Sequence, residues 1–185
     1  QARLTVSNRG RLVSGSLGTW VPVGGQGLKV GAALSLLTYS LGGTFADLGA
    51  TGAAQSLLVR ASYPIWRTQT ANLVFETNGE YKRLRDDLEL VGNSNPKRSL
   101  QVRVALAADL RDGLGGGGVS SGNLGLTSGN LRLLDSTASD NDASGLHTAG
   151  SFKKANLMLA REQVLRGPLS AYLRYSSQFA RSNLD

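Results

Sequence analysis

A regular alternation of apolar and polar side chains in residues 99–111, SLQVRVALAADLR, constrains the fold more than any other feature. Successive side chains of a β-strand point to opposite faces, so residues two apart share a face. One face then carries only Leu100, Val102, Val104, Leu106, Ala108 and Leu110. The other carries Gln101, Arg103, Ala105, Ala107, Asp109 and Arg111. The stretch predicts one long strand with an apolar face and a polar face.

The same alternation recurs along the chain. It is clear in LKVGAALSLLTYS (28–40) and LSAYLRYSSQF (169–179), and weaker in SFKKANLMLAR (151–161). No segment has a convincing 3.6-residue stripe. The nearest candidate, YKRLRDDLELV (81–91), fits a helical turn in a loop or a strand that runs into a polar loop, and we favour the strand. The pattern predicts an all-β, antiparallel fold with eight or nine strands and no helix.

The connections alternate in length in a way that favours one kind of β-sheet. Shorter connections are predicted at 24–27, 67–70, 112–118 and 165–168, and longer ones at 42–52, 87–99 and 135–150. Transmembrane β-barrels have short turns at one end and longer loops at the other. The segments between are also longer than the roughly 5–6 residues typical of soluble strands. We therefore expect residues 1–185 to form part of an antiparallel transmembrane β-barrel, with the odd strand count pointing to missing strands.

This fold assigns a role to each face. Lipid is expected against the apolar faces, and an aqueous lumen against the polar ones. The candidates for lining the lumen are Arg103, Asp109, Arg111 and Arg174. Aromatic side chains near strand ends fit the girdle that such barrels carry at the membrane interface. The candidates for that girdle are Tyr63, Trp66 and Tyr172, with burial in a soluble core as the alternative.

Composition limits the classes of function. The chain has no Cys, and its single His147 leaves no His-based metal cluster or catalytic triad. The net charge of +7 comes from basic residues scattered along the strands beside acidic ones, so nucleic-acid binding is not expected. No apolar run is long enough for a membrane helix. The chain opens without a signal peptide, so either a signal was removed or the chain is an internal piece.

Three short motifs could carry chemistry, and each is better explained without it. The run Gly115 to Gly118 lacks the Lys and Ser or Thr of a phosphate-binding loop. The loop that holds Asp135, Asp140 and Asp142 lacks the closing Glu of a calcium loop. Asp86, Asp87 and Glu89 lie beside arginines, so their charge is compensated. We expect no catalytic, cofactor or metal site and no enzyme activity.

Several stretches resemble a known family. ASYPIWRTQTANLVFETNGEYKRLRDD (61–87) is similar to a barrel motif in which a Tyr-Pro-hydrophobic-Arg turn joins two long strands. Residues 119–135 and 142–185 resemble the following strands, which end in Gln178, Asn183, Leu184 and Asp185. The opening LTVSNRGRLVSGSLG (4–18) is similar to the first hairpin. The family is that of two-partner secretion transporters, the haemolysin-activator and filamentous-haemagglutinin transporters of type V secretion.

The resemblance implies an outer-membrane protein that exports a large β-helical exoprotein without ATP hydrolysis or a cofactor. Its partners would be that exoprotein and outer-membrane lipid. The chain departs from the family between Gly18 and Val23, where an extra hairpin is usual. The periplasmic polypeptide-transport-associated domains, the pore loop and the closing strands are expected outside these residues. A passive porin or structural barrel, and a soluble β-sandwich adhesin, remain the alternatives.

Overall fold

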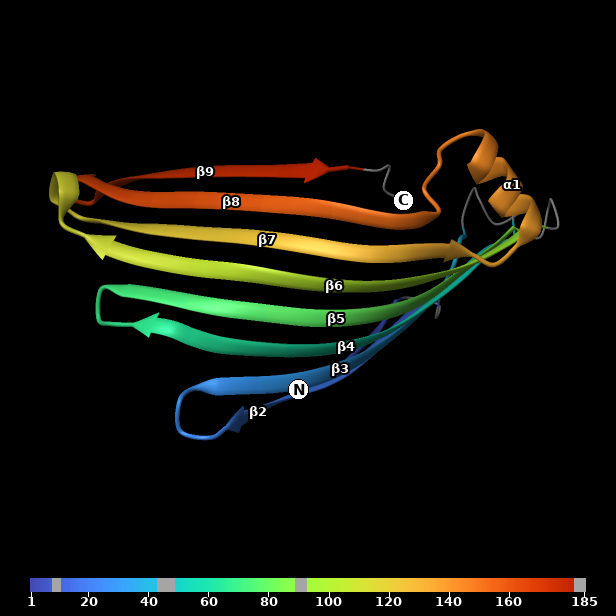
Figure 1. Ribbon diagram of the computed structural model, residues 1–185, viewed down its shortest axis with the longest axis horizontal. Helices are drawn as coiled ribbons and strands as arrows, with labels where there is room; N and C mark the ends of the chain where they lie inside the picture. The colour runs from blue at the N-terminus through green and yellow to red at the C-terminus, as the bar shows by residue number, and fades with distance from the viewer. Residues whose placement is uncertain (8–10, 43–48, 89–92, 182–185) are drawn as a thin grey trace.

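The structure, a computed structural model, is a single antiparallel sheet and describes residues 1–7, 11–42, 49–88 and 93–181. Nine strands lie in chain order, each paired with the next (Figure 1). They are β1 (Ala2–Val6), β2 (Leu12–Val23), β3 (Leu28–Ser40), β4 (Ala50–Arg67), β5 (Ala71–Leu88), β6 (Asn93–Asp112), β7 (Gly118–Leu133), β8 (Gly150–Arg166) and β9 (Leu169–Ala180). The all-β, antiparallel prediction and its strand count are confirmed.

The strands are long for a soluble protein. They run to 18 residues in β4 and β5 and to 20 in β6, against roughly 5–6 in typical soluble strands. Two short helices complete the described residues, the 3-10 helix η4 (Leu114–Gly116) and α1 (Ser136–Ser144). Within these ranges, neither helix has the length and hydropathy needed to cross a membrane.

The register extends the alternation seen in one strand across the whole sheet. Val104 pairs with Leu126, and Leu126 with Ala155. One residue along, Arg103 pairs with Thr127, and Thr127 with Lys154. Because paired residues point to the same side, each face of β6 continues into its neighbours. We call the side of Leu100 and Val104 the apolar face and the side of Arg103 the polar face.

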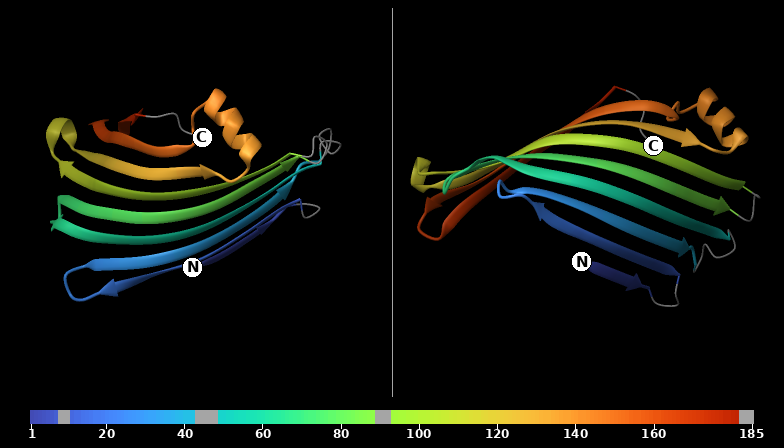
Figure 2. Two further views of the ribbon diagram at one scale, coloured as in Figure 1. Left: turned by 45° about the vertical axis from the view of Figure 1, so that its right-hand side comes forward. Right: turned by 60° about the horizontal axis from the view of Figure 1, so that its bottom comes forward.

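The sheet is strongly curved, and burial shows which face lies inside the curve. Figure 2 shows the strands forming an open trough. All buried residues of the described ranges lie on the polar face: Gly31, Ala50, Gly52, Ala105, Gly125, Thr127 and Leu131. On the apolar face, Val102 is 53% exposed and Leu173 is 74% exposed. Since curvature crowds side chains together on the concave side, the polar face is the inner one.

The two ends of the sheet differ less in connection length than the sequence suggested. One end has the connections 24–27, 68–70, 113–117 and 167–168, and the other has 7–11, 41–49, 89–92 and 134–149. The predicted long connection at 87–99 is wrong, because β5 runs to Leu88 and β6 begins at Asn93. The same strand ending confirms that YKRLRDD is extended rather than helical. We call the second end, where α1 lies, the helix end (Figure 1).

The helix α1 was not predicted and lies in the acidic loop. Its N-cap is Asp135, whose Oδ1 accepts a hydrogen bond of 2.9 Å from the Ala138 backbone N–H. The carboxylate of Asp142 accepts bonds from the Thr148 hydroxyl at 2.6 Å and from the N–H groups of Thr148 and Ala149 at 2.8 Å. These donors, the Thr148 hydroxyl above all, lower the pKa of Asp142. Two of the three aspartates that suggested calcium, Asp135 and Asp142, therefore hold the loop in place.

The loop should loosen when Asp142 loses its charge. The pKa of Asp142 is lower in the folded loop than in the unfolded chain. The ionised carboxylate therefore stabilises the loop at pH values above its unfolded pKa of about 3.9. That contribution is lost as the pH falls through the lower folded pKa. Asp142→Asn should speed amide hydrogen exchange at Thr148 and Ala149 near pH 6. Asp140→Asn is the matched control, since within the described residues only the backbone carbonyl of Asp140 accepts a side-chain hydrogen bond, from Ser144, and its carboxylate has no hydrogen bond or ion pair. Equal exchange in both variants would contradict this role.

Candidate functional site

The polar face is the candidate site because it gathers the charged and amide side chains on the inside of the curve. The register places all four predicted residues, Arg103, Asp109, Arg111 and Arg174, on this face. They come from β6 and β9, at separate places on the sheet. The site is therefore a surface that spans several strands rather than a compact cluster.

Arg103 is held in place by its neighbours. Its Nη2 donates to Asn123 Oδ1 at 2.7 Å, and its Nη1 lies 3.9 Å from Glu76 Oε2. The guanidinium reaches Asn123 by lying over Gly125, where a Cβ would come 2.6 Å from Nη2. A glycine at this position is thus what leaves room for the arginine.

Further polar pairs join the strands on the same face. Asn72 Nδ2 of β5 donates to Asp109 Oδ2 of β6 at 2.9 Å. Gln101 Nε2 donates to Glu80 Oε2 at 2.6 Å, and Lys82 Nζ lies 3.1 Å from the same oxygen. On the last two strands, Asn156 Nδ2 donates to Gln178 Oε1 at 2.9 Å. These bonds fix polar side chains at three separate places on the inner wall.

Two other polar-face residues carry no such bonds. Within the described ranges, the guanidinium groups of Arg111 and Arg174 make no hydrogen bond or ion pair, and both side chains are exposed. Arg103 and Asp109, by contrast, are bonded. The polar face therefore combines polar groups that are held by hydrogen bonds with two guanidinium groups that are free to bind an anion.

Aromatic rings on the polar face lie over glycines of the neighbouring strand. Trp20 pairs with Gly31, Tyr39 with Gly52, and Phe152 with Gly129. At Gly52 and Gly129 an added Cβ would overlap the ring, and at Gly31 it would come 3.0 Å from the Trp20 ring and 2.5 Å from the Thr19 carbonyl oxygen. Tyr39 thereby crosses β4 to donate from its hydroxyl to Asp86 Oδ1 at 2.8 Å. The sequence shows these residues, but only the register shows the pairs.

Trp20 has a second contact. The guanidinium carbon of Arg60 lies 4.2 Å from the centroid of its ring, within the range of a cation–π interaction. The Arg60 Nε is buried and makes no hydrogen bond. The ring thus stabilises a positive charge on the inner wall, which the sequence alone did not reveal.

The three predicted interface aromatics do not share a face. Tyr63 and Trp66 lie on the apolar face near the 68–70 turn, where a register shift between Pro64 and Trp66 turns Trp66 outward. Tyr172 pairs with Glu162 and lies on the polar face, beside Arg174. Tyr172 therefore does not share the apolar face of Tyr63 and Trp66, as the prediction required. The alternation in 169–179 puts Tyr175 on the apolar face instead.

The remaining sequence motifs have structural roles. Asp86 accepts from Tyr39 on the polar face, whereas Asp87 pairs with Arg85 at 2.8 Å on the apolar face. The described residues include no group of three or more acidic, His or Cys side chains placed to hold a metal. Glu89, Asn183, Leu184 and Asp185 lie outside the described residues.

The glycine run near Gly115 is a turn held by side chains that sequence reasoning missed. Gln163 Nε2 donates to the carbonyls of Leu114 at 2.7 Å and Gly117 at 2.9 Å. Beside it, Arg161 Nη1 lies 2.8 Å from Asp112 Oδ2. These contacts close the connection between β6 and β7.

Filling the space beneath Tyr39 should destabilise the sheet. In Gly52→Ala, the new Cβ would displace the Tyr39 ring and break its bond to Asp86. Overpacking of this kind costs about 1–3 kcal/mol. The control is Gly79→Ala, since that glycine also lies within a strand but has nothing within 4 Å of an added Cβ. Urea unfolding should show a loss of stability for Gly52→Ala alone, and equal midpoints would contradict the packing role.

Comparison with protein-family models, with curated proteins and with solved structures found no match for this chain. Its function must therefore be inferred from its own residues and their geometry.

Proposed function

We propose that this chain is part of the outer-membrane β-barrel of a two-partner secretion transporter, which exports a large β-helical exoprotein. In this proposal the apolar face contacts acyl chains, and the polar face lines an aqueous lumen. The exoprotein crosses in an extended form along that lumen.

The observation that carries the proposal is the continuous, uncovered apolar face. Large aliphatic side chains on it are exposed from the first strand to the last, including Leu4, Leu34, Val59, Leu126 and Leu173. In the described residues no second layer packs on them. Exposed apolar patches of this size mark a surface that another phase or molecule covers. A bilayer covers such a face on every strand at once.

The height of the apolar face fits a bilayer. From Leu100 to Leu110, a rise of about 3.3 Å per residue reduced by a tilt of about 40° gives a band about 25 Å tall. That equals the apolar band of outer-membrane barrels, about 25 Å. Tyr63 and Trp66 lie near one end of the band, and Tyr81, paired with Leu100, lies at the other. A soluble sandwich adhesin has no need of strands this long.

The edges of the sheet set a further requirement. β1 and β9 each have one unpaired side in the described sheet. In hydrocarbon each unpaired backbone group costs several kcal/mol, so a membrane sheet must close. The proposal therefore requires additional strands that pair with β1 and β9.

Protein export is favoured over passive diffusion by the turn motif and by the polar face. The Tyr63-Pro64-Ile65-Trp66-Arg67 segment ends β4 and leads through residues 68–70 into the equally long β5. The resemblance to secretion transporters implies a turn of this kind between two long strands. Fixed amide and carboxylate groups beside the free Arg111 and Arg174 offer an extended chain hydrogen-bond partners in place of water. This exchange needs no ATP.

The test is a secretion assay with the exoprotein encoded beside this protein. Deleting the gene should abolish export, and restoring it should recover export. Restoring a gene that carries both Arg111→Gln and Arg174→Gln should slow export, because the two free positive groups are gone. The amount of folded protein should stay the same. Export that continues after the deletion, together with a loss of small-solute conductance, would favour the passive porin and refute the transporter.

A further inference from the structure

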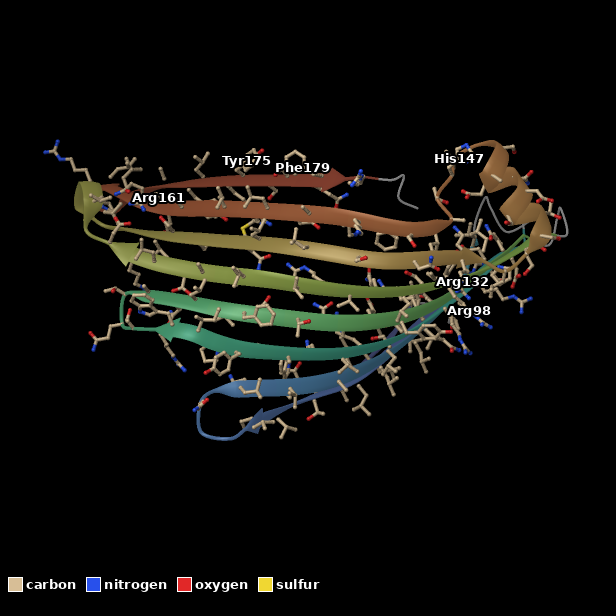
Figure 3. The ribbon with its side chains drawn as sticks, in the orientation of Figure 1. Arg98, Arg132, His147, Arg161, Tyr175 and Phe179 are labelled. Atoms are coloured by element: carbon tan, nitrogen blue, oxygen red, sulfur yellow. The ribbon has the colours of Figure 1, made fainter. Side chains whose placement is uncertain are left out.

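Three arginines form a row on the apolar face at the helix end of the sheet. Arg83 of β5 pairs with Arg98 of β6, and Arg98 pairs with Arg132 of β7. All three side chains are exposed. Figure 3 shows Arg98 and Arg132 next to each other at this end, and Arg161 at the opposite end. We call these three residues the arginine row.

Such a row is unfavourable without an anion. Like charges directly opposite each other on adjacent strands destabilise a sheet. Arg83 Nε donates to the Tyr81 hydroxyl at 2.8 Å, and Arg132 Nε donates to Asn130 Oδ1 at 3.3 Å. These partners are neutral, and in the described part of the chain none of the three arginines has a carboxylate partner. The same face does pair Arg85 with Asp87 and Arg161 with Asp112.

The place of the row points to a lipid headgroup. On β6, Arg98 lies two residues beyond Leu100, where the apolar band ends, and Tyr81 lies directly beside Leu100. Two residues of tilted strand rise about 5 Å, which puts the guanidinium groups at the level of lipid headgroups. Arginine binds phosphate through paired N–H donors, and a row of three matches a headgroup with more than one phosphate.

We propose that the arginine row binds the phosphate groups of an outer-leaflet glycolipid that carries two phosphates. The inference rests on the proposed function, because only a sheet embedded in the outer membrane brings such a lipid to this face. The lipid neutralises the row and so stabilises the pairing of β5, β6 and β7 at the helix end.

The test compares two variants that each remove two positive charges. Arg98→Gln/Arg132→Gln removes most of the row, and Arg67→Gln/Arg166→Gln removes two exposed charges at the opposite end of the sheet. Each purified protein in detergent is mixed with lipid A that carries two phosphates or one, and binding is measured by native mass spectrometry. A basic residue near an anionic surface contributes about fivefold to binding, so the row variant should bind the two-phosphate lipid about 25-fold more weakly.

The wild-type protein and the opposite-end control should prefer the two-phosphate lipid equally. Equal binding of that lipid by the wild type and the row variant would overturn the inference. Complete displacement of the lipid by millimolar inorganic phosphate would also overturn it, since the site would then be one for free phosphate. If the double variant does not fold, two other variants replace it, Arg132→Gln alone and Arg98→Lys/Arg132→Lys. The lysine variant should bind the two-phosphate lipid more weakly than the wild type and more tightly than the glutamine variant.

A separate measurement distinguishes this inference from the proposed function. Protection from protease in phospholipid vesicles reports whether the wild-type strands insert into a bilayer. Insertion without a phosphate preference refutes the arginine row alone. Failure to insert refutes the membrane proposal and, with it, the lipid site.

Discussion

The backbone hydrogen-bond ladder is the constraint on which the rest of this structure depends. It joins nine strands in chain order without a crossover and fixes the register of each neighbouring pair, with shifts only at Pro64/Trp66 and Val164/Arg166 in the described residues. Because the side chains of a strand alternate with a period of two, a slip of one residue would exchange the two faces of that strand. The register therefore turns a local alternation, such as that of 99–111, into two surfaces of opposite character.

Each surface is specialised by what the register brings together. On the inner surface, glycines lie beneath Trp20, Tyr39 and Phe152, which lets large side chains pack within a tight curve. Polar pairs such as Asn72 with Asp109 fix the wall, while Arg111 and Arg174 stay free among the described residues. On the outer surface, the apolar band gives way to the arginine row at the helix end. Lipid contact, transport and headgroup binding are thus proposed for separate regions of one sheet.

The sequence was sufficient where the information is local. Alternation predicted the strands, their number and the side on which Arg103, Asp109, Arg111 and Arg174 lie. Alternation did not predict contacts between residues that are distant in the sequence. It also did not predict the structure of polar segments, where no apolar side chains show a period. The arginine row needs the pairing of residues 83, 98 and 132, and the Tyr39–Asp86 bond crosses an intervening strand. The polar run 87–99 resembled a loop but is mostly strand, because pairing between β5 and β6 stabilises it. Helix α1 depends on an Asp135 cap within a polar loop that has no apolar stripe.

The chain's two tryptophans lie on opposite faces, which allows a direct measurement of which face meets lipid. Trp66 is on the apolar face, and Trp20 is on the polar face against Arg60. Single-tryptophan proteins made by Trp20→Phe or Trp66→Phe can be folded into vesicles whose lipids carry bromine on the acyl chains. Brominated lipid should quench the fluorescence of Trp66 strongly and that of Trp20 hardly at all. Strong quenching of Trp20 with Trp66 unaffected would reverse the two faces and contradict the proposal.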